Sequence, residues 1–307
     1  MPGRLLAAIG RHAPPCLAAG VFLGLVLPDL AALLRPALGP LVALLLAGSL
    51  LRLDWQMLAA TLRRPGSLAL ATGWQLMVSP ALAWALTFFA GLPPGLTQAL
   101  ILNAAAPSLV ASVTLAQLTG LDAPLAATLV VVTTLFLPLT LTPVMFWLLG
   151  LDLAVDLAAF YTRFGLFVAL PFALAGALRF VLPGALFARH AMTIDGFNVV
   201  VLVLAALAMM DGVTARLLSA PGSVALFLAA ATLFNACFQV LGALLFRAQG
   251  RHLALSMGLV SGNRNTALIL VLAGGIAHTD LALYVAMAQI PIYLLPLVAK
   301  PIYSRLV

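Results

Sequence analysis

Ten apolar segments follow one another along this chain, most of them long enough to cross a lipid bilayer as a helix. The connections between them are short, and several carry a proline near the start of the next segment, where a missing N–H does least harm. A backbone inside lipid must satisfy its own hydrogen bonds, which a helix does within one segment. We therefore predict an all-α integral membrane protein with ten transmembrane helices, numbered 1 to 10, at residues 13–34, 36–51, 66–90, 95–120, 122–149, 160–182, 193–213, 217–246, 251–277 and 279–303.

The composition excludes a water-soluble domain. Of the 307 residues, 64% are hydrophobic and only 7% are charged, far fewer charges than a soluble surface carries. The formal charge of +7 comes from basic residues scattered at segment ends, so it indicates membrane topology rather than nucleic-acid binding. The first apolar stretch has no small-residue cleavage site, so we expect it to be a retained helix rather than a signal peptide.

The distribution of basic residues predicts the orientation in the membrane. Ten crossings put both termini on one side, and the positive-inside rule assigns most basic residues to the cytoplasm. We therefore predict a multi-pass protein of the bacterial inner (plasma) membrane with both termini cytoplasmic. The inside set is then Arg4, Arg11, Arg52, Arg63, Arg64, Arg179, Arg189, Arg247, Arg251, Lys300 and Arg305, and the outside set is Arg35, Arg163 and Arg216.

The remaining basic residue, Arg264, lies in the tetrad Gly262-Asn263-Arg264-Asn265, with apolar sequence on both sides. The whole stretch reads as one membrane crossing, so the guanidinium is expected near mid-bilayer. A charge there costs several kcal/mol or more unless it faces protein or a watery cavity. We interpret Arg264 as part of a functional site. The alternative is a buried arginine satisfied by helix-end carbonyls.

Two of the ten segments are interrupted, at Asn103–Ser108 and at Ser261–Asn265. Each is the fourth segment of a five-helix half, and an odd number of helices gives the two halves opposite orientations. Matched broken helices in inverted halves point to the substrate site of a secondary transporter. We predict inverted repeats at 1–152 and 153–307. The alternative is that Pro107 only kinks its helix and Gly262 only aids packing.

At this point the chain resembles a known family, the bile acid:sodium symporters. The resemblance follows the predicted helix order over nearly the whole chain. It is carried by Gly48 to Trp55 between helices 2 and 3, Trp74-Gln75 to Pro80 on helix 3, Ala106-Pro107 to Ser112 on helix 4, Pro138 to Pro143 on helix 5, and Gly262 to Thr266 on helix 9.

The resemblance implies a panel of helices 1, 2, 6 and 7 and a core of helices 3–5 and 8–10, in which broken helices 4 and 9 cross. It implies alternating-access transport of a small organic anion, bile-acid-like or a small carboxylate, coupled to two sodium ions. The partners expected are this anion and the lipid bilayer, with no cofactor. The candidate substrate-binding residues are Arg264, Asn263, Asn265, Gln75, Ser108, Ser112, Pro107 and Thr266.

The chain departs from the family where sodium would bind. Sodium needs oxygen ligands, but the aligned positions are Val113, Ala126, Val130 and Val260, and Arg264 replaces a glutamine. We hypothesise that Arg264 is an internal substitute for bound sodium and that two-sodium coupling is lost. The alternative is a relocated sodium ion, for which the remaining candidates are Ser112, Gln75 and Ser261.

Other functions receive less support from the sequence. No Ser-His-Asp set, metal-binding HExxH or phosphate-binding loop is present in the sequence, so we do not expect an enzyme. A membrane ligand sensor that kept the fold without transporting is the rival class. Arsenite efflux ranks low, because the related family usually carries a cysteine where Ala106 stands.

Overall fold

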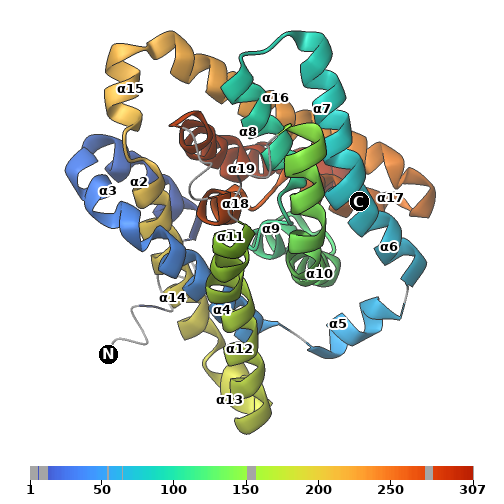
Figure 1. The fold of residues 1–307 in the computed structure, drawn as a ribbon. Helices are drawn as coiled ribbons and strands as arrows, with labels where there is room; N and C mark the ends of the chain where they lie inside the picture. The colour runs from blue at the N-terminus through green and yellow to red at the C-terminus, as the bar shows by residue number, and fades with distance from the viewer. Residues whose placement is uncertain are drawn as a thin grey trace. The chain divides into compact units, whose positions relative to one another are not determined.

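The computed structural model describes residue 6 and residues 13–53, 55–63, 65–150, 157–273 and 279–306, and every named element in them is a helix. Figure 1 shows these helices coloured along the chain. The chain divides into two compact units, each assembled from two separate stretches of sequence. Unit 1 comprises Met1–Leu53 and Leu157–Val224, and unit 2 comprises Asp54–Asp156 and Ala225–Val307.

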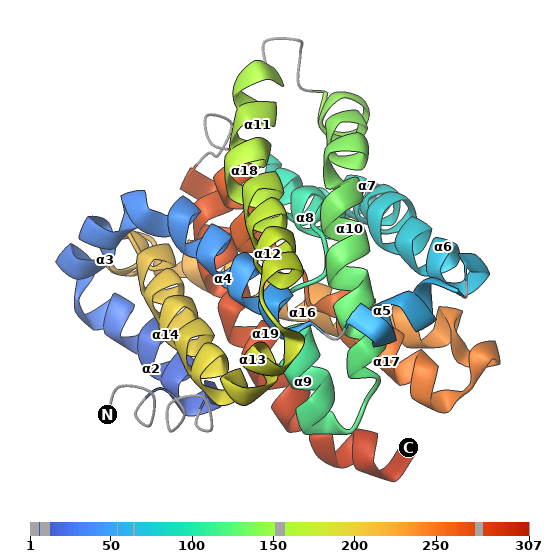
Figure 2. The same cartoon turned by 90° about the horizontal axis from the view of Figure 1, so that it is seen from below.

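Unit 1 is organised around the long helix α14. This helix packs against both α2 and α4, and α4 in turn packs against α12 (Figures 1 and 2). Close approach depends on glycines: a Cβ at Gly39 of α4 would lie 2.7 Å from the ring of Phe167. The elements of unit 1 are α2 (Ala13–Val26), α3 (Pro28–Leu34), η1 (Arg35–Ala37), α4 (Leu38–Arg52), α11 (Leu157–Phe164), η4 (Gly165–Ala169), α12 (Leu170–Val181), α13 (Gly184–Arg189), α14 (Ala191–Met209) and α15 (Val213–Ser219).

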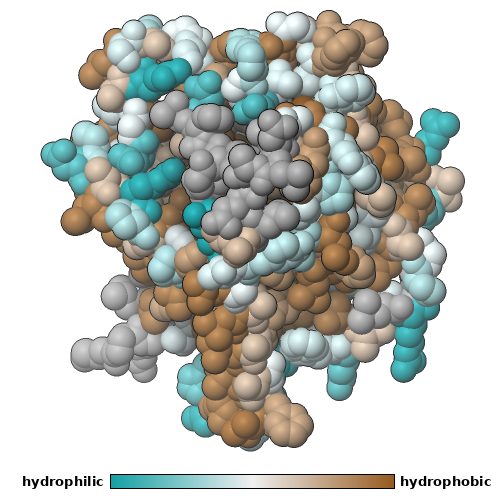
Figure 3. All heavy atoms as spheres, in the orientation of Figure 1, coloured by the Kyte–Doolittle hydropathy of each residue, from teal (hydrophilic) through white to brown (hydrophobic). Residues whose placement is uncertain are grey.

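The outward side of α12 is apolar, as expected of a helix that faces lipid. Leu170, Leu174 and Leu178 follow one another at four-residue spacing and are all exposed. A helix facing water would carry polar side chains at such positions. Figure 3 shows hydrophobic side chains over much of the visible face. Exposed leucines in this register therefore indicate a membrane environment.

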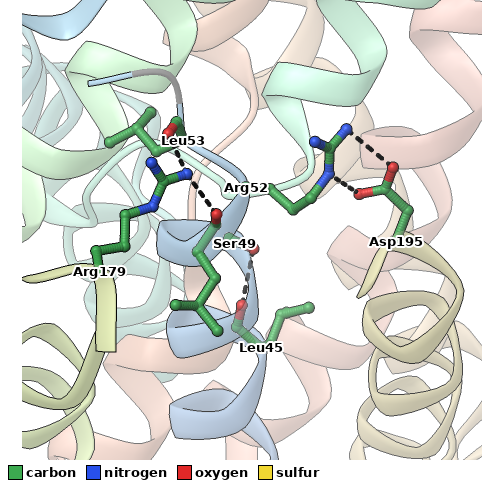
Figure 4. A network of polar contacts seen from close by, with 7 residues as sticks. Leu45, Ser49, Arg52, Leu53, Arg179 and Asp195 are labelled. Atoms are coloured by element: carbon green, nitrogen blue, oxygen red, sulfur yellow. Dashed lines mark hydrogen bonds and ion pairs between the residues drawn. The ribbon is translucent and has the colours of Figure 1, made fainter. Parts of the chain in front are cut away.

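A polar network closes the C-terminal end of α4 (Figure 4). The Arg179 Nη2 donates to the carbonyl oxygens of Leu51 and Leu53 at 2.5 and 2.7 Å. Arg52 pairs with Asp195 through both its Nε, at 2.7 Å, and its Nη2, at 3.1 Å. The last carbonyls of a helix have no partner within it, so the first of these arginines caps α4 directly.

Unit 2 holds both interrupted segments. Its π-helical turns, η2 and η3, lie within longer helical runs, and helix α16 begins just before the division between the units. The elements of unit 2 are α5 (Trp55–Leu62), α6 (Pro65–Gly73), η2 (Trp74–Val78), α7 (Ser79–Ala90), α8 (Pro94–Ala105), α9 (Ser112–Thr119), α10 (Ala123–Pro143), η3 (Val144–Leu148), α16 (Pro221–Leu245), η5 (Arg247–Gln249), α17 (Arg251–Gly262), α18 (Thr266–Ala273) and α19 (Thr279–Leu306).

Six helices in the described residues are long and apolar enough to cross a membrane. The segments predicted at 95–120 and 251–277 are divided, into α8 and α9 and into α17 and α18. The number of ten crossings stays a prediction. The six helices are Pro28–Arg52, Ala123–Leu148, Ala158–Val181, Ala191–Ser219, Pro221–Leu245 and Asp280–Pro301.

One predicted boundary was wrong. The sequence analysis treated 13–34 as one helix, but α2 ends at Val26 and α3 starts at Pro28. Between them Leu27 has φ −117° and ψ 68°, outside the helical region. A residue before proline is disfavoured in the α conformation, because the proline ring collides with its backbone.

Candidate functional site

The two interruptions meet in unit 2 as a short antiparallel pairing. Ser108, after α8, and Arg264, after α17, form the isolated bridge. The Leu109 N–H donates to the Asn263 carbonyl at 3.1 Å, and the Asn265 N–H donates to the Pro107 carbonyl at 2.8 Å. The extended segments thus satisfy each other's backbone groups, which lipid could not do. We call residues 106–109 and 262–266 the paired breaks.

The Arg264 side chain is fully buried beside the paired breaks, with 0% of its surface exposed. Its Nε donates to the Ser261 carbonyl at 2.8 Å. Its Nη1 donates to the carbonyls of Gln75 at 3.1 Å and Ala106 at 3.2 Å, with a longer contact to Gln75 Oε1 at 3.4 Å. Its Nη2 donates to Ser79 Oγ at 2.9 Å. Five oxygens from three segments therefore surround one permanent positive charge.

The Gln75 carbonyl is available because of a π turn and a proline. In η2 the Ser79 N–H bonds to the Trp74 carbonyl, five residues back, instead of to Gln75. In that register the next N–H would come from residue 80 and reach Gln75, but residue 80 is proline and has none. The Gln75 carbonyl is left without a helical donor and accepts from the guanidinium instead.

The other carbonyls around Arg264 lie at helix C-termini. Ala106 follows α8 with ψ 148°, and the next residue is a proline that cannot continue the helix. Ser261 is in the last turn of α17, which ends at Gly262. The last carbonyls of a helix have no partner within it and carry its negative dipole end. Two half-helices therefore point their negative ends at one guanidinium.

Gln75 and Ser108 connect helix 3 to the first break. The Ser108 hydroxyl donates to Gln75 Oε1 at 2.6 Å, and its backbone N–H donates to Thr133 Oγ1 at 3.0 Å. The Thr133 hydroxyl in turn donates to the Leu129 carbonyl of its own helix. The sequence analysis proposed Gln75 and Ser108 as site residues, and the structure brings them together.

Asn263 and Asn265 serve the backbone of the second break. The Asn263 Nδ2 donates to the Leu259 carbonyl at 2.8 Å, and Asn265 Oδ1 accepts from the Leu268 N–H at 3.2 Å. One asparagine closes the end of α17 and the other caps the start of α18. Neither is among the acceptors of Arg264 within the described chain, although the sequence analysis expected both to satisfy it.

Three buried polar atoms near the paired breaks have no hydrogen-bond partner among the described residues. They are Ser112 Oγ, Thr266 Oγ1 and Gln75 Nε2. Ser112 and Thr266 are the first residues of α9 and α18. These hydroxyls therefore lie at the positive ends of two half-helices, where a negatively charged group is favoured.

The structure changes the expected role of Arg264. The sequence analysis grouped it with residues that contact the substrate, but its donors point to internal oxygens and its surface is buried. The guanidinium lies at helix C-termini, whereas the sequence analysis expected it to converge with helix N-termini. Its alternative interpretation, an arginine satisfied by helix-end carbonyls, describes these contacts.

Four residues around the breaks were missed or undervalued. Ser79 accepts from Arg264, and Thr133 holds the backbone of Ser108. The Trp74 indole donates to Ser261 Oγ at 2.8 Å. Asn235 donates to the Gly262 carbonyl at 3.0 Å. The available signal was their polarity within apolar helices, which does not by itself tell a site residue from an ordinary interhelical hydrogen bond.

The candidate sodium ligands are already engaged in part. The Ser261 hydroxyl accepts from Trp74 and donates to the Met257 carbonyl at 2.6 Å. Gln75 Oε1 accepts from both Ser108 and Arg264. Ser112 Oγ is the one side-chain oxygen of these three candidates with no partner in the described residues.

The comparisons with known proteins agree with this architecture. A family model described as the Sodium Bile acid symporter family matches residues 39–219, more than half of the chain. No curated protein matches the chain. The matched residues include the first break but not the second. The chain belongs to the Sodium Bile acid symporter family, and it is a multi-pass membrane transporter of that type.

Proposed function

We propose that this protein is a secondary transporter of a small organic anion, in which Arg264 permanently replaces a coupling cation. The observation that carries the proposal is the shell of five oxygens around the guanidinium. Carbonyls at the C-terminal ends of broken helices are the groups that coordinate cations in transporters of this kind of architecture. Here a covalently attached cation occupies such a shell.

A permanent charge in this shell opposes the binding of a second cation. Two unit positive charges about 4 Å apart repel by about 4 kcal/mol at an effective dielectric constant of about 20. That corresponds to roughly a thousandfold in affinity. The aligned sodium positions on the neighbouring segments, Val113, Ala126, Val130 and Val260, supply no side-chain oxygen. Both features support transport without two-sodium coupling.

The anion is proposed to bind at the start of α9 and α18. Ser112 Oγ and Thr266 Oγ1 are buried hydroxyls with no partner in the described residues, and each begins a half-helix. Helix N-termini favour negative charge through their free N–H groups and their dipole. Arg264 adds a positive potential nearby without contacting the anion. Its contribution to anion affinity is therefore electrostatic.

The division of the chain supports a two-part transport mechanism. Unit 1 gathers predicted helices 1, 2, 6 and 7, and unit 2 gathers most of the rest. We assign unit 1 to the panel and unit 2 to the core, with inverted repeats at 1–152 and 153–307. Alternating access would then come from motion of one unit against the other. The ten crossings, the bacterial inner membrane and the cytoplasmic termini belong to the same proposal.

The test is uptake by the purified protein in proteoliposomes. The substrates are a bile acid, a short carboxylate and an alkyl sulfonate, each measured with inward sodium, potassium or choline gradients. We expect saturable uptake of at least one anion at a rate that does not depend on the cation. A rate that rises steeply with sodium alone would show a relocated sodium site. Saturable binding without uptake of any anion would show a sensor.

A further inference from the structure

We infer that Asn235, Gln239 and Tyr303 form a positioning relay that fixes the second break and, through it, Arg264. The Tyr303 hydroxyl donates to Gln239 Oε1 at 2.7 Å. The Gln239 Nε2 donates to Asn235 Oδ1 at 2.5 Å, and Asn235 Nδ2 donates to the Gly262 carbonyl at 3.0 Å. The relay thus runs from the end of α19 through α16 to the residue pair that precedes Arg264.

The relay answers a need that the break creates. The Gly262 carbonyl ends α17 and has no helical donor. An unpaired buried carbonyl costs about 1–3 kcal/mol, and Asn235, only 2% exposed, supplies the donor. The same Nδ2 also donates to Asn263 Oδ1 at 3.1 Å. One amide group therefore holds two consecutive residues of the break.

Each member of the relay fixes the orientation of the next. A side-chain amide has one accepting oxygen and one donating nitrogen, and reversing it exchanges the two. Reversing Gln239 would place its NH₂ against the Tyr303 hydroxyl and its oxygen against Asn235 Oδ1. Reversing Asn235 would place its oxygen against the Gly262 carbonyl. A hydroxyl at one end of the relay thereby sets which group faces the break at the other end.

Glycines bring α16 close enough to α17 for these contacts. A Cβ at Gly262 would lie 2.5 Å from both the Asn235 carbonyl oxygen and Gln239 Cγ. A Cβ at Gly258 would lie 2.6 Å from the Gln239 carbonyl oxygen. Small residues at four-residue spacing allow such close helix packing in membranes. The two helices are therefore joined by packing as well as by hydrogen bonds.

The consequence concerns the transport cycle and so rests on the proposed function. Arg264 directly follows the two residues that Asn235 holds, and its own backbone pairs with Ser108. Weakening the relay should let the second break shift and loosen the guanidinium in its oxygen shell. Gln239 and Tyr303 contact neither paired break through a hydrogen bond in the described residues, so they are positioning residues.

The experiment compares Tyr303→Phe with Tyr293→Phe in the full-length protein in lipid nanodiscs. Both variants remove one hydroxyl from α19, but the Tyr293 hydroxyl has no hydrogen-bond partner in the described residues. Amide hydrogen exchange is followed at Leu109 and Asn265, whose N–H groups join the paired breaks. We expect exchange roughly fivefold to tenfold faster in Tyr303→Phe, as the loss of about one hydrogen bond implies, and unchanged in Tyr293→Phe.

A double variant tests whether the members act in series. Gln239→Met removes both relay contacts of this residue. Adding Tyr303→Phe should then accelerate exchange no further, whereas independent effects would multiply. Equal exchange in Tyr303→Phe and Tyr293→Phe, or multiplying effects, would overturn the relay. Because exchange needs no substrate, this result stands apart from the proposed function, which fails only if the wild type transports no organic anion.

Discussion

Two arginine sites in this protein use the same chemistry in different surroundings. Arg179 of unit 1 and Arg264 of unit 2 both donate to carbonyls at helix C-termini, where the helix dipole favours a cation. The network around Arg179 includes the Arg52–Asp195 pair, whose side chains are each 36% exposed. Arg264 is fully buried and has five oxygens around it. Burial therefore turns an ordinary helix cap into a fixed internal charge.

The comparison predicts a large difference in what each arginine contributes. Water can replace a lost contact at an exposed site, but it cannot reach the carbonyls that Arg264 satisfies. Each buried acceptor left without a donor costs about 1–3 kcal/mol, whereas exposed ion pairs contribute about 0–1 kcal/mol. The following variants order the effects from the largest to the smallest.

Arg264→Gln should have the largest effect. We expect anion uptake to be lost and the melting temperature in detergent to fall sharply, because several buried oxygens lose their donors at about 1–3 kcal/mol each. Sodium should not restore uptake, since the sequence still lacks the oxygens at Val113, Ala126, Val130 and Val260. Arg264→Lys keeps the charge with three donors and should retain part of the stability. Wild-type uptake and stability in Arg264→Gln would remove the central role of this residue.

Gly262→Ala should be the next most damaging change. Its new Cβ would lie 2.5 Å from the backbone oxygen of Asn235, so α16 and α17 must separate, at a cost of about 1–3 kcal/mol. Gly176→Ala is the matched control in unit 1, because a Cβ there meets nothing within 4 Å. The control should be neutral or slightly stabilising, since alanine favours a helix interior by about 0.5–1 kcal/mol. Melting temperatures of the two variants measure the contrast, and equal values would contradict it.

Pro80→Ala should have an intermediate effect. It restores an N–H that can compete for the Gln75 carbonyl, and one weakened hydrogen bond to Arg264 corresponds to about 1 kcal/mol. We expect a several-fold lower uptake rate. Pro171→Ala is the control, because Pro171 follows the π turn η4 at the same spacing but lies in unit 1. If both variants slow uptake equally, the proline acts through helix shape and not through Arg264.

Asp195→Asn should have the smallest effect. It removes the exposed partner of Arg52, and such pairs contribute about 0–1 kcal/mol and weaken in salt. We expect a change in melting temperature that disappears at high ionic strength, with uptake unchanged. The measurement is thermal unfolding at low and high salt. A salt-independent loss of stability would show that this pair is not an ordinary surface pair.

The sequence alone determined the class of this protein and the positions where its helices break. Apolar segments can satisfy their backbone in lipid only as helices, so composition and segment length were enough for the fold class. Pro107 and the Gly262–Asn265 tetrad interrupt those segments by local chemistry, because proline lacks an N–H and glycine favours a helix end. Both interruptions are therefore readable without a neighbour.

Only the tertiary structure decided what the polar side chains at the breaks touch. A helical sequence does not state which side of a helix meets which partner, so Ser79, Thr133 and Asn235 looked like ordinary polar residues in apolar helices. The π turn at Trp74–Val78 rotates Gln75 and frees its carbonyl, a shift that local propensity does not encode. Arg264 was recognisable as costly from its position alone. Its five acceptors come from segments up to 189 residues apart, and only folding brings them to one charge.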